Sequence, residues 1–166
     1  HIVNQLTQNN AWLDFEGIVT HIGLEILPSL PQHIFGLSGE YLLDNGMSFR
    51  NVNEDEYLAL VYDLKRESDY HRIALVLQKF ILKKIREKDL KIGPIENVLQ
   101  TIYKLNGFIT VPKLADENFL SERTLRRNFT KTVGLAPKYY AKIIQINHVF
   151  DAIKTNNEKE IYKIAL

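Results

Sequence analysis

The sequence predicts an α+β N-terminal part, built from a short sheet and helices, followed by an all-α C-terminal domain. Apolar residues alternate with smaller or polar ones between residues 17 and 27, whereas the later apolar patterns repeat at helical spacing. The charge also changes along the chain. Residues 1–90 carry 9 Lys or Arg against 13 Asp or Glu, and residues 91–166 carry 12 against 7. The balances are −4 and +5, so a polyanionic partner is expected to meet only the second half.

The N-terminal part is expected to hold one strand and two main helices. Residues 17–27 predict a strand with one buried face, which Pro28 and Pro31 end. A short helical turn is predicted at residues 32–36, and turn residues follow up to Gly46. Amphipathic helices are predicted over residues 54–65 and 69–88. Residues 1–88 therefore predict the tail of an α+β domain, and residues 89–94, ending in Gly93-Pro94, a linker.

The C-terminal domain, residues 95–166, contains the most strongly marked helix ends of the chain. Residues 95–106 predict an amphipathic helix, and a short helix of residues 112–117 follows it. Ser121 is suited to cap the start of a helix, and Gly134 is suited to the left-handed position after its end. A long helix is predicted from Pro137 to about Lys154, with one face inward, formed by Tyr140, Ile143, Ile144, Val149 and Ile153.

The predicted helix of residues 121–133 has an apolar back and a cationic front. At about 100° per residue, one side carries Leu125, Phe129, Thr132 and Val133, and the other carries Arg123, Arg126, Arg127, Thr130 and Lys131. Two short helices, a brief turn and a basic outer face on the second predict a helix-turn-helix at residues 112–134, with residues 121–133 as its recognition helix. Two alternatives stay open: an ordinary solvated surface, and a protein-interaction module whose basic helix docks an acidic partner.

Three stretches in and directly after this motif resemble the DNA-binding domain of the AraC/XylS family of bacterial transcription regulators. They are Leu114-Ala115, the run from Leu120 to Phe129, and the run from Val133 to Ala141, which contains Gly134 and Ala136-Pro137. The resemblance covers about residues 95–166. It implies a homeodomain-like fold in which two helix-turn-helix units are joined by a long helix, here residues 137–154, and each inserts a recognition helix into the major groove.

The resemblance also sets expectations for both ends of the chain. Residues 158–166 look like the start of the second unit, because Ile164-Ala165 echoes Leu114-Ala115. The second recognition helix would then be cut off. Residues 1–88 would be the C-terminal portion of a sensor or dimerisation domain. The chain lacks an initiator Met, so we expect a fragment of a longer protein.

Roles for individual residues follow from the resemblance. Arg123, Arg126 and Arg127 occupy positions that the family aims at base edges, and a guanidinium can bind guanine O6 and N7 together. We expect two of them to contact bases and one to contact phosphate. Phosphate contacts are expected from the start of the helix and from five side chains: Ser121, Thr124, Thr130, Lys131 and Lys138.

Three departures from the family pattern carry their own expectations. Phe119 stands where the family usually has Gly or Asn, so Asn118 is expected to take the left-handed conformation of the turn instead. Gln145 stands where the family commonly has Arg, which removes one phosphate or structural contact. A chain with only one complete unit should bind DNA weakly and with strong salt dependence.

The sequence disfavours an enzyme. The five His residues are scattered and cysteine is absent, so no metal-ligand spacing appears. There is no glycine-rich phosphate loop or nucleophile elbow. We therefore expect no catalytic residues, cofactor or metal. No apolar run approaches the roughly 20 residues that span a bilayer. The expected partners are double-stranded DNA, a small-molecule effector of unknown identity and a second copy of the chain, in the cytoplasm at the nucleoid and not in a membrane.

Overall fold

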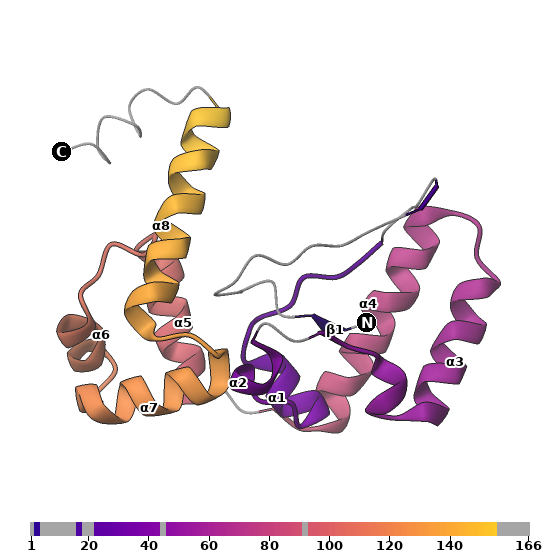
Figure 1. Cartoon of the computed structure of the whole chain (residues 1–166), viewed down its shortest axis with the longest axis horizontal. Coiled ribbons are helices and arrows are strands. Elements are labelled where there is room, and N and C mark those ends of the chain that lie inside the picture. Colours follow the sequence, from indigo (N-terminus) through magenta and orange to yellow (C-terminus); the bar gives the residue numbers. More distant parts are fainter. Residues whose placement is uncertain (1, 4–15, 18–21, 44–45, 91–92, 156–166) are drawn as a thin grey trace. The chain divides into compact units, whose positions relative to one another are not determined.

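The computed structural model describes residues 2–3, 16–17, 22–43, 46–90 and 93–155 (Figure 1). Contacts divide the chain into two units, residues 1–91 and residues 92–166. Each unit has its own set of helices. None of the described helices is both long and apolar enough to cross a membrane.

The first unit is built from short elements followed by two longer helices. Its described elements are β1 (Ile2–Val3), α1 (Leu30–Phe35), α2 (Gly39–Leu42), β2 (Gly46–Met47), the 3-10 helix η1 (Phe49–Asn51), α3 (Glu54–Lys65) and α4 (Tyr70–Glu87). β1 pairs antiparallel with β2, and Ile2 lies opposite Met47. This two-residue pair is the only sheet in the described part of the chain.

The α+β prediction for this unit is wrong, because its described residues are essentially all-α. Residues 17 and 22–27, which the alternation assigned to a strand, are not in one, and residues 18–21 lie outside the described part. Alternation shows which side chains are apolar, but a strand also needs a neighbour for its backbone hydrogen bonds. Ile22 and Ile26 instead line a hollow beside the helices.

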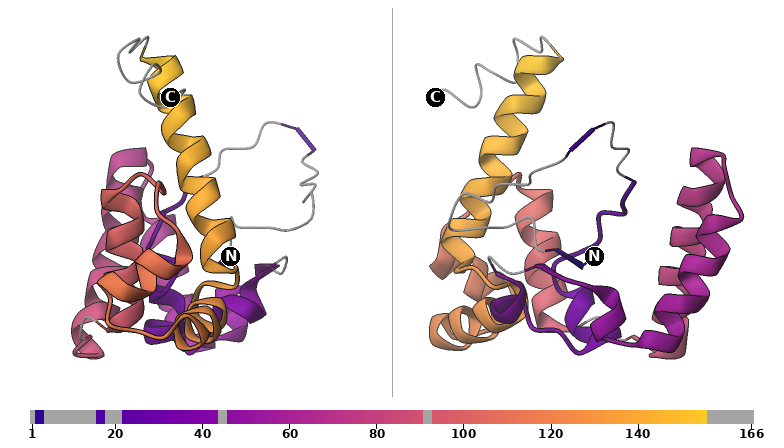
Figure 2. Two further views of the ribbon diagram at one scale, coloured as in Figure 1. Left: turned by 90° about the vertical axis from the view of Figure 1, so that its left-hand side faces the viewer. Right: turned by 45° about the vertical axis from the view of Figure 1, so that its right-hand side comes forward.

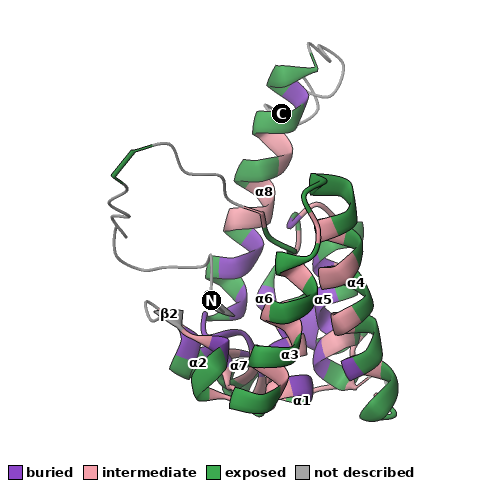
Figure 3. Cartoon of the chain, turned by 90° about the vertical axis from the view of Figure 1, so that its right-hand side faces the viewer, coloured by how far each residue is buried: buried purple, intermediate pink, exposed green. Residues whose placement is uncertain are grey.

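Helices α3 and α4 begin at side-chain caps. Asn53 Oδ1 accepts a hydrogen bond from the Glu56 amide at 3.0 Å, and Asp69 Oδ1 accepts from the His71 amide at 2.7 Å. Both helices lie within one residue of their predicted bounds. Their inner faces are nevertheless only half-buried, as the colouring of Figure 3 shows. Among the described residues, α3 buries none and α4 buries only Lys84.

The described part of the second unit contains α5 (Pro94–Lys104), α6 (Val111–Glu117), α7 (Glu122–Val133) and α8 (Pro137–Lys154). These bounds lie within two residues of the predicted ones. Every one of these helices contributes to one apolar core, whose fully buried members include Val98, Leu99, Ile102, Leu114, Leu125, Phe129, Val133 and Tyr140. The second unit therefore has the filled interior that the first unit lacks.

Helix α8 departs from its predicted burial towards its C-terminal end. Tyr140 is buried as predicted, and Ile143, Ile144 and Val149 are half-buried, but Ile153 is 52% exposed. The prediction for Ile153 is wrong because α8 continues past the other helices of its unit (Figure 2). The predicted start of a second helix-turn-helix, residues 158–166, lies outside the described residues.

Candidate nucleic-acid interface

Helix α7 begins and ends at the residues that the sequence indicated. Ser121 Oγ accepts a hydrogen bond from the Thr124 amide at 3.2 Å and donates one to Thr124 Oγ1 at 2.9 Å. At the other end, Gly134 takes the left-handed conformation, with φ of 91°, and its amide donates to the Thr130 carbonyl at 2.7 Å. Two of the three hydroxyls expected to contact phosphate, those of Ser121 and Thr124, are thus also part of the helix cap.

The apolar face of α7 is packed into the core of the second unit. Leu125, Phe129 and Val133 are fully buried. The Phe129 ring packs edge-on against the Tyr140 ring of α8, with centroids 5.6 Å apart. The Tyr140 hydroxyl in turn lies 2.6 Å from the Tyr103 hydroxyl of α5. Burial of a Leu or Phe side chain contributes about 1.5–3 kcal/mol, so α7 cannot rotate about its axis without losing several kcal/mol.

The turn between α6 and α7 corrects one expectation. Phe119 has a φ of +54°, so Phe119 itself takes the left-handed conformation, and Asn118 does not. The cause is the closing geometry of α6: the Phe119 amide donates to the Asp116 carbonyl at 3.1 Å, and the Leu120 amide donates to the Ala115 carbonyl at 2.9 Å. This bonding pattern requires a left-handed residue just after the helix, whatever its side chain. Asn118 instead donates its side-chain amide to the Leu114 carbonyl.

The contact expected to be lost at Gln145 is replaced by another. Gln145 Nε2 in α8 donates a hydrogen bond to the Gly107 carbonyl at 2.8 Å. This bond joins α8 to the turn between α5 and α6. The Gln145 side chain therefore makes a structural contact of its own within the second unit.

The three arginines at the candidate base-reading positions are all exposed, but they are not equivalent. Arg126 Nη2 donates to Glu122 Oε2 at 3.0 Å, and Arg127 Nε donates to Asn128 Oδ1 at 3.3 Å. Arg123 makes no hydrogen bond or ion pair with the part of the chain that the structure describes. At about 100° per residue, Arg123 and Arg127 lie opposite the buried Leu125 and Phe129, whereas Arg126 lies at the edge of that outward face.

Lys131 extends this outward face by one more turn. Arg123, Arg127 and Lys131 are spaced at i, i+4 and i+8, and all three are exposed; we call them the cationic row. With a rise of 1.5 Å per residue, the row spans about 12 Å of helix. Of the other predicted phosphate contacts, Thr124 and Thr130 are half-buried, Ser121 is exposed, and Lys138 is exposed in the first turn of α8.

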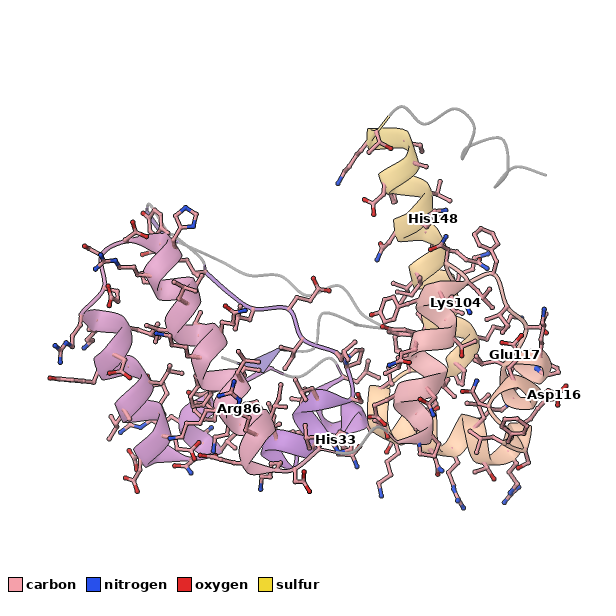
Figure 4. The ribbon with its side chains drawn as sticks, turned by 180° about the vertical axis from the view of Figure 1, so that it is seen from behind. His33, Arg86, Lys104, Asp116, Glu117 and His148 are labelled. Atoms are coloured by element: carbon pink, nitrogen blue, oxygen red, sulfur yellow. The ribbon has the colours of Figure 1, made fainter. Side chains whose placement is uncertain are left out.

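Sequence reasoning missed the role of Glu122. Its carboxylate pairs with Arg126 at the i,i+4 spacing in which an acidic residue precedes a basic one, the more favourable order on a helix. The i,i+4 spacing of Glu122 and Arg126 in the sequence could have indicated this ion pair. Two further acidic residues, Asp116 and Glu117, lie exposed at the end of α6 (Figure 4). Among the described helices of this unit, α7 carries the most exposed cations: Arg123, Arg126, Arg127 and Lys131.

Comparison of the chain with protein-family models, with curated proteins and with solved structures finds no match. Within the described residues, no three His, Asp or Glu side chains gather in a group that could hold a metal ion. The features that mark this candidate interface are therefore the geometry of α6 and α7 and the charges that these helices carry.

Proposed function

We propose that the chain is a sequence-specific DNA-binding transcription regulator of the AraC/XylS type, whose helix α7 enters the major groove. The observation that supports this most directly is the cationic row of Arg123, Arg127 and Lys131 on the outer face of a helix whose opposite face is buried. The major groove is about 12 Å wide and accepts one α-helix. A locked helix with a basic outer face suits it in both size and charge.

The contacts of the arginines divide their roles. Arg123 and Arg127 lie on the outward face, so these two guanidinium groups contact base edges. Arg126 lies at the edge of the face, held by Glu122, and contacts the phosphate backbone. Lys131, Lys138 and the exposed Ser121 complete the phosphate contacts. The first unit senses an effector or mediates self-association, and no catalytic step belongs to this proposal.

The test is a fluorescence anisotropy titration with a duplex selected from random sequence by the full chain. Arg127→Ala should weaken binding to the selected duplex by about 1–3 kcal/mol and reduce its preference over random duplex. Arg126→Ala should weaken both duplexes equally and lower the salt slope by about 1. The matched control is Lys104→Ala, which removes an exposed cation on α5 and should change affinity less than about twofold.

Two results would contradict the proposal. One is that selection yields no preferred sequence and every duplex of equal length binds alike. The other is that Arg127→Ala and Lys104→Ala have the same effect. Tight, saturable binding to an acidic protein together with the absence of DNA preference would instead favour the protein-interaction alternative.

A further inference from the structure

The first unit contains a hollow where a packed core would be expected. The apolar faces of α3 and α4 turn towards each other, yet Leu60, Val61, Leu64, Ile73 and Leu77 are all only half-buried. Interiors of folded proteins are normally close-packed, with few voids larger than a water molecule. Here the two faces, together with α1, η1 and residues 22–26, line a cavity of about 430 Å³.

The lining of this cavity has a definite chemistry. One wall is aromatic: the Phe35 and Phe49 ring centroids lie 5.3 Å apart, and those of Phe49 and Phe80 lie 5.2 Å apart. The remaining described lining residues are aliphatic, apart from Gly23 and from Tyr57, the one of them whose side chain carries a polar group. None of the described residues that line the cavity is charged. A charged guest would lose its hydration there without gaining a partner.

The volume decides what kind of occupant fits. Small-molecule sites typically measure about 300–1,000 Å³ and are lined mostly by apolar and aromatic side chains. Water fills about 30 Å³ per molecule, so the cavity would hold on the order of a dozen waters, with few groups to bind them. An apolar guest would release those waters and would gain contact with the aromatic wall.

We infer that this cavity binds a small, uncharged molecule with an apolar body of about one to three rings, positioned by the Tyr57 hydroxyl. The inference is independent of DNA binding, because occupancy can be measured directly. A second copy of the chain is a poorer occupant, because the leucines that α3 and α4 expose do not line the hollow. They are Leu58 and Leu75 at 51% each and Leu82 at 42%.

Two fluorescent probes with the same ring system distinguish binding of the proposed ligand class from nonspecific hydrophobic binding. N-phenyl-1-naphthylamine is uncharged, and 1-anilinonaphthalene-8-sulfonate carries the same ring system with a sulfonate. The uncharged probe should saturate at one molecule per chain and bind at least about tenfold more tightly than the sulfonate. Equal affinity for the two probes, no saturation, or one probe per two chains with a change of oligomeric state would each overturn the inference.

Filling the hollow gives a second, independent readout. Leu77→Trp should place an indole in the cavity and weaken the uncharged probe at least about tenfold, while Leu75→Trp, on the outer face of α4, should leave its affinity unchanged. Circular dichroism verifies the fold of each variant. If Leu77→Trp does not fold, Val61→Phe on α3 replaces it as the cavity-filling variant. Equal affinities in the filled and control variants would overturn the inference. If neither filled variant folds, the comparison of the two probes on the unaltered chain still decides.

Discussion

The Gln145 side chain of α8 donates a hydrogen bond to the Gly107 carbonyl oxygen, with nitrogen and oxygen 2.8 Å apart. The turn that contains Gly107 lies directly against the backbone of α8. A Cβ atom added at Gly107 would overlap the Ala141 carbonyl oxygen and would come within 3.0 Å of the backbone nitrogen of Gln145. Gly107 also has a φ of +78°. The turn between α5 and α6 and helix α8 thus meet at a position where only glycine fits.

Gly107→Ala should therefore destabilise the chain by about 2 kcal/mol or more, because it adds both backbone strain and overlap with α8. Urea unfolding followed by circular dichroism measures the change. Gln145→Ala removes the hydrogen bond but leaves the close approach, so it should cost only about 1 kcal/mol. If Gly107→Ala has no effect on the unfolding midpoint, the turn does not lie against α8 in solution.

Helix positions in the second unit could be predicted from sequence because their signals are local. Ser121 and Gly134 mark helix ends through hydrogen bonds that span three or four residues, and Pro137 marks a helix start because its missing N–H costs little in the first turn. The strand predicted at residues 17–27 had no such support. Alternation is a one-segment pattern, whereas a strand depends on a partner elsewhere in the chain. The hollow between α3 and α4 was equally unpredictable, because apolar stripes look the same whether the space between them is filled or not.

The candidate site shows the same division. The exposed basic side chains of α7 followed from the helical repeat. The left-handed Phe119 did not, because the closing hydrogen bonds of α6 set that conformation and override the preference of the residue. The i,i+4 spacing of Glu122 and Arg126 makes an ion pair between them possible. Only the structure shows that the two side chains form it.

Phe119→Gly should stabilise the chain by about 1 kcal/mol. Phe119 is 97% exposed, so removing its ring gives up almost no buried area. A bulky residue at a φ of +54° is strained, and glycine adopts that conformation without steric cost. The measurement is again the free energy of unfolding in urea.

Phe119→Ala is the matched control for this strain. Alanine also removes the ring but keeps the Cβ atom that causes the conformational cost. It should therefore stay within about 0.5 kcal/mol of the unaltered chain. If alanine and glycine stabilise the chain equally, the left-handed conformation at this position is not the source of the effect.

Glu122→Gln should tighten DNA binding by about two- to fivefold, if α7 is the recognition helix. The substitution removes a negative charge from the first turn of α7 and releases Arg126 from its ion pair. The stability of α7 should fall slightly, by about 0.3–1 kcal/mol, because the substitution removes the favourable interaction between an acidic side chain and the positive N-terminal end of the helix dipole. Anisotropy titrations at two salt concentrations test this. Glu117→Gln on α6 is the control, and an equal gain from it would mean that only net charge matters.

Lys84 of α4 should stabilise the first unit in a pH-dependent way. It is the one charged residue buried in α4, and its ammonium pairs with Glu56 of α3 and lies 3.4 Å from Glu87. Burial by itself would lower the pKa of Lys84, but the hydrogen bonds and charges of Glu56 and Glu87 outweigh it, so the pKa lies above its ordinary value of 10.5. Lys84→Met should cost about 1–2 kcal/mol at neutral pH, because two carboxylates then lack their shared cation.

The sign of the pH dependence follows from that raised pKa. A lysine whose pKa is higher in the folded state than in the unfolded chain stabilises the fold fully below the unfolded value. That contribution is lost as the pH rises through the folded value. The difference in unfolding free energy between the unaltered chain and Lys84→Met should thus be constant from about pH 6 to 9 and should shrink above about pH 10.5. Lys83→Met, which removes a neighbouring cation with a 73% exposed side chain, should change stability by less than about 0.5 kcal/mol throughout. A Lys84→Met difference that stays constant above pH 11, or equals that of Lys83→Met, would show that the pair with Glu56 does not stabilise the unit.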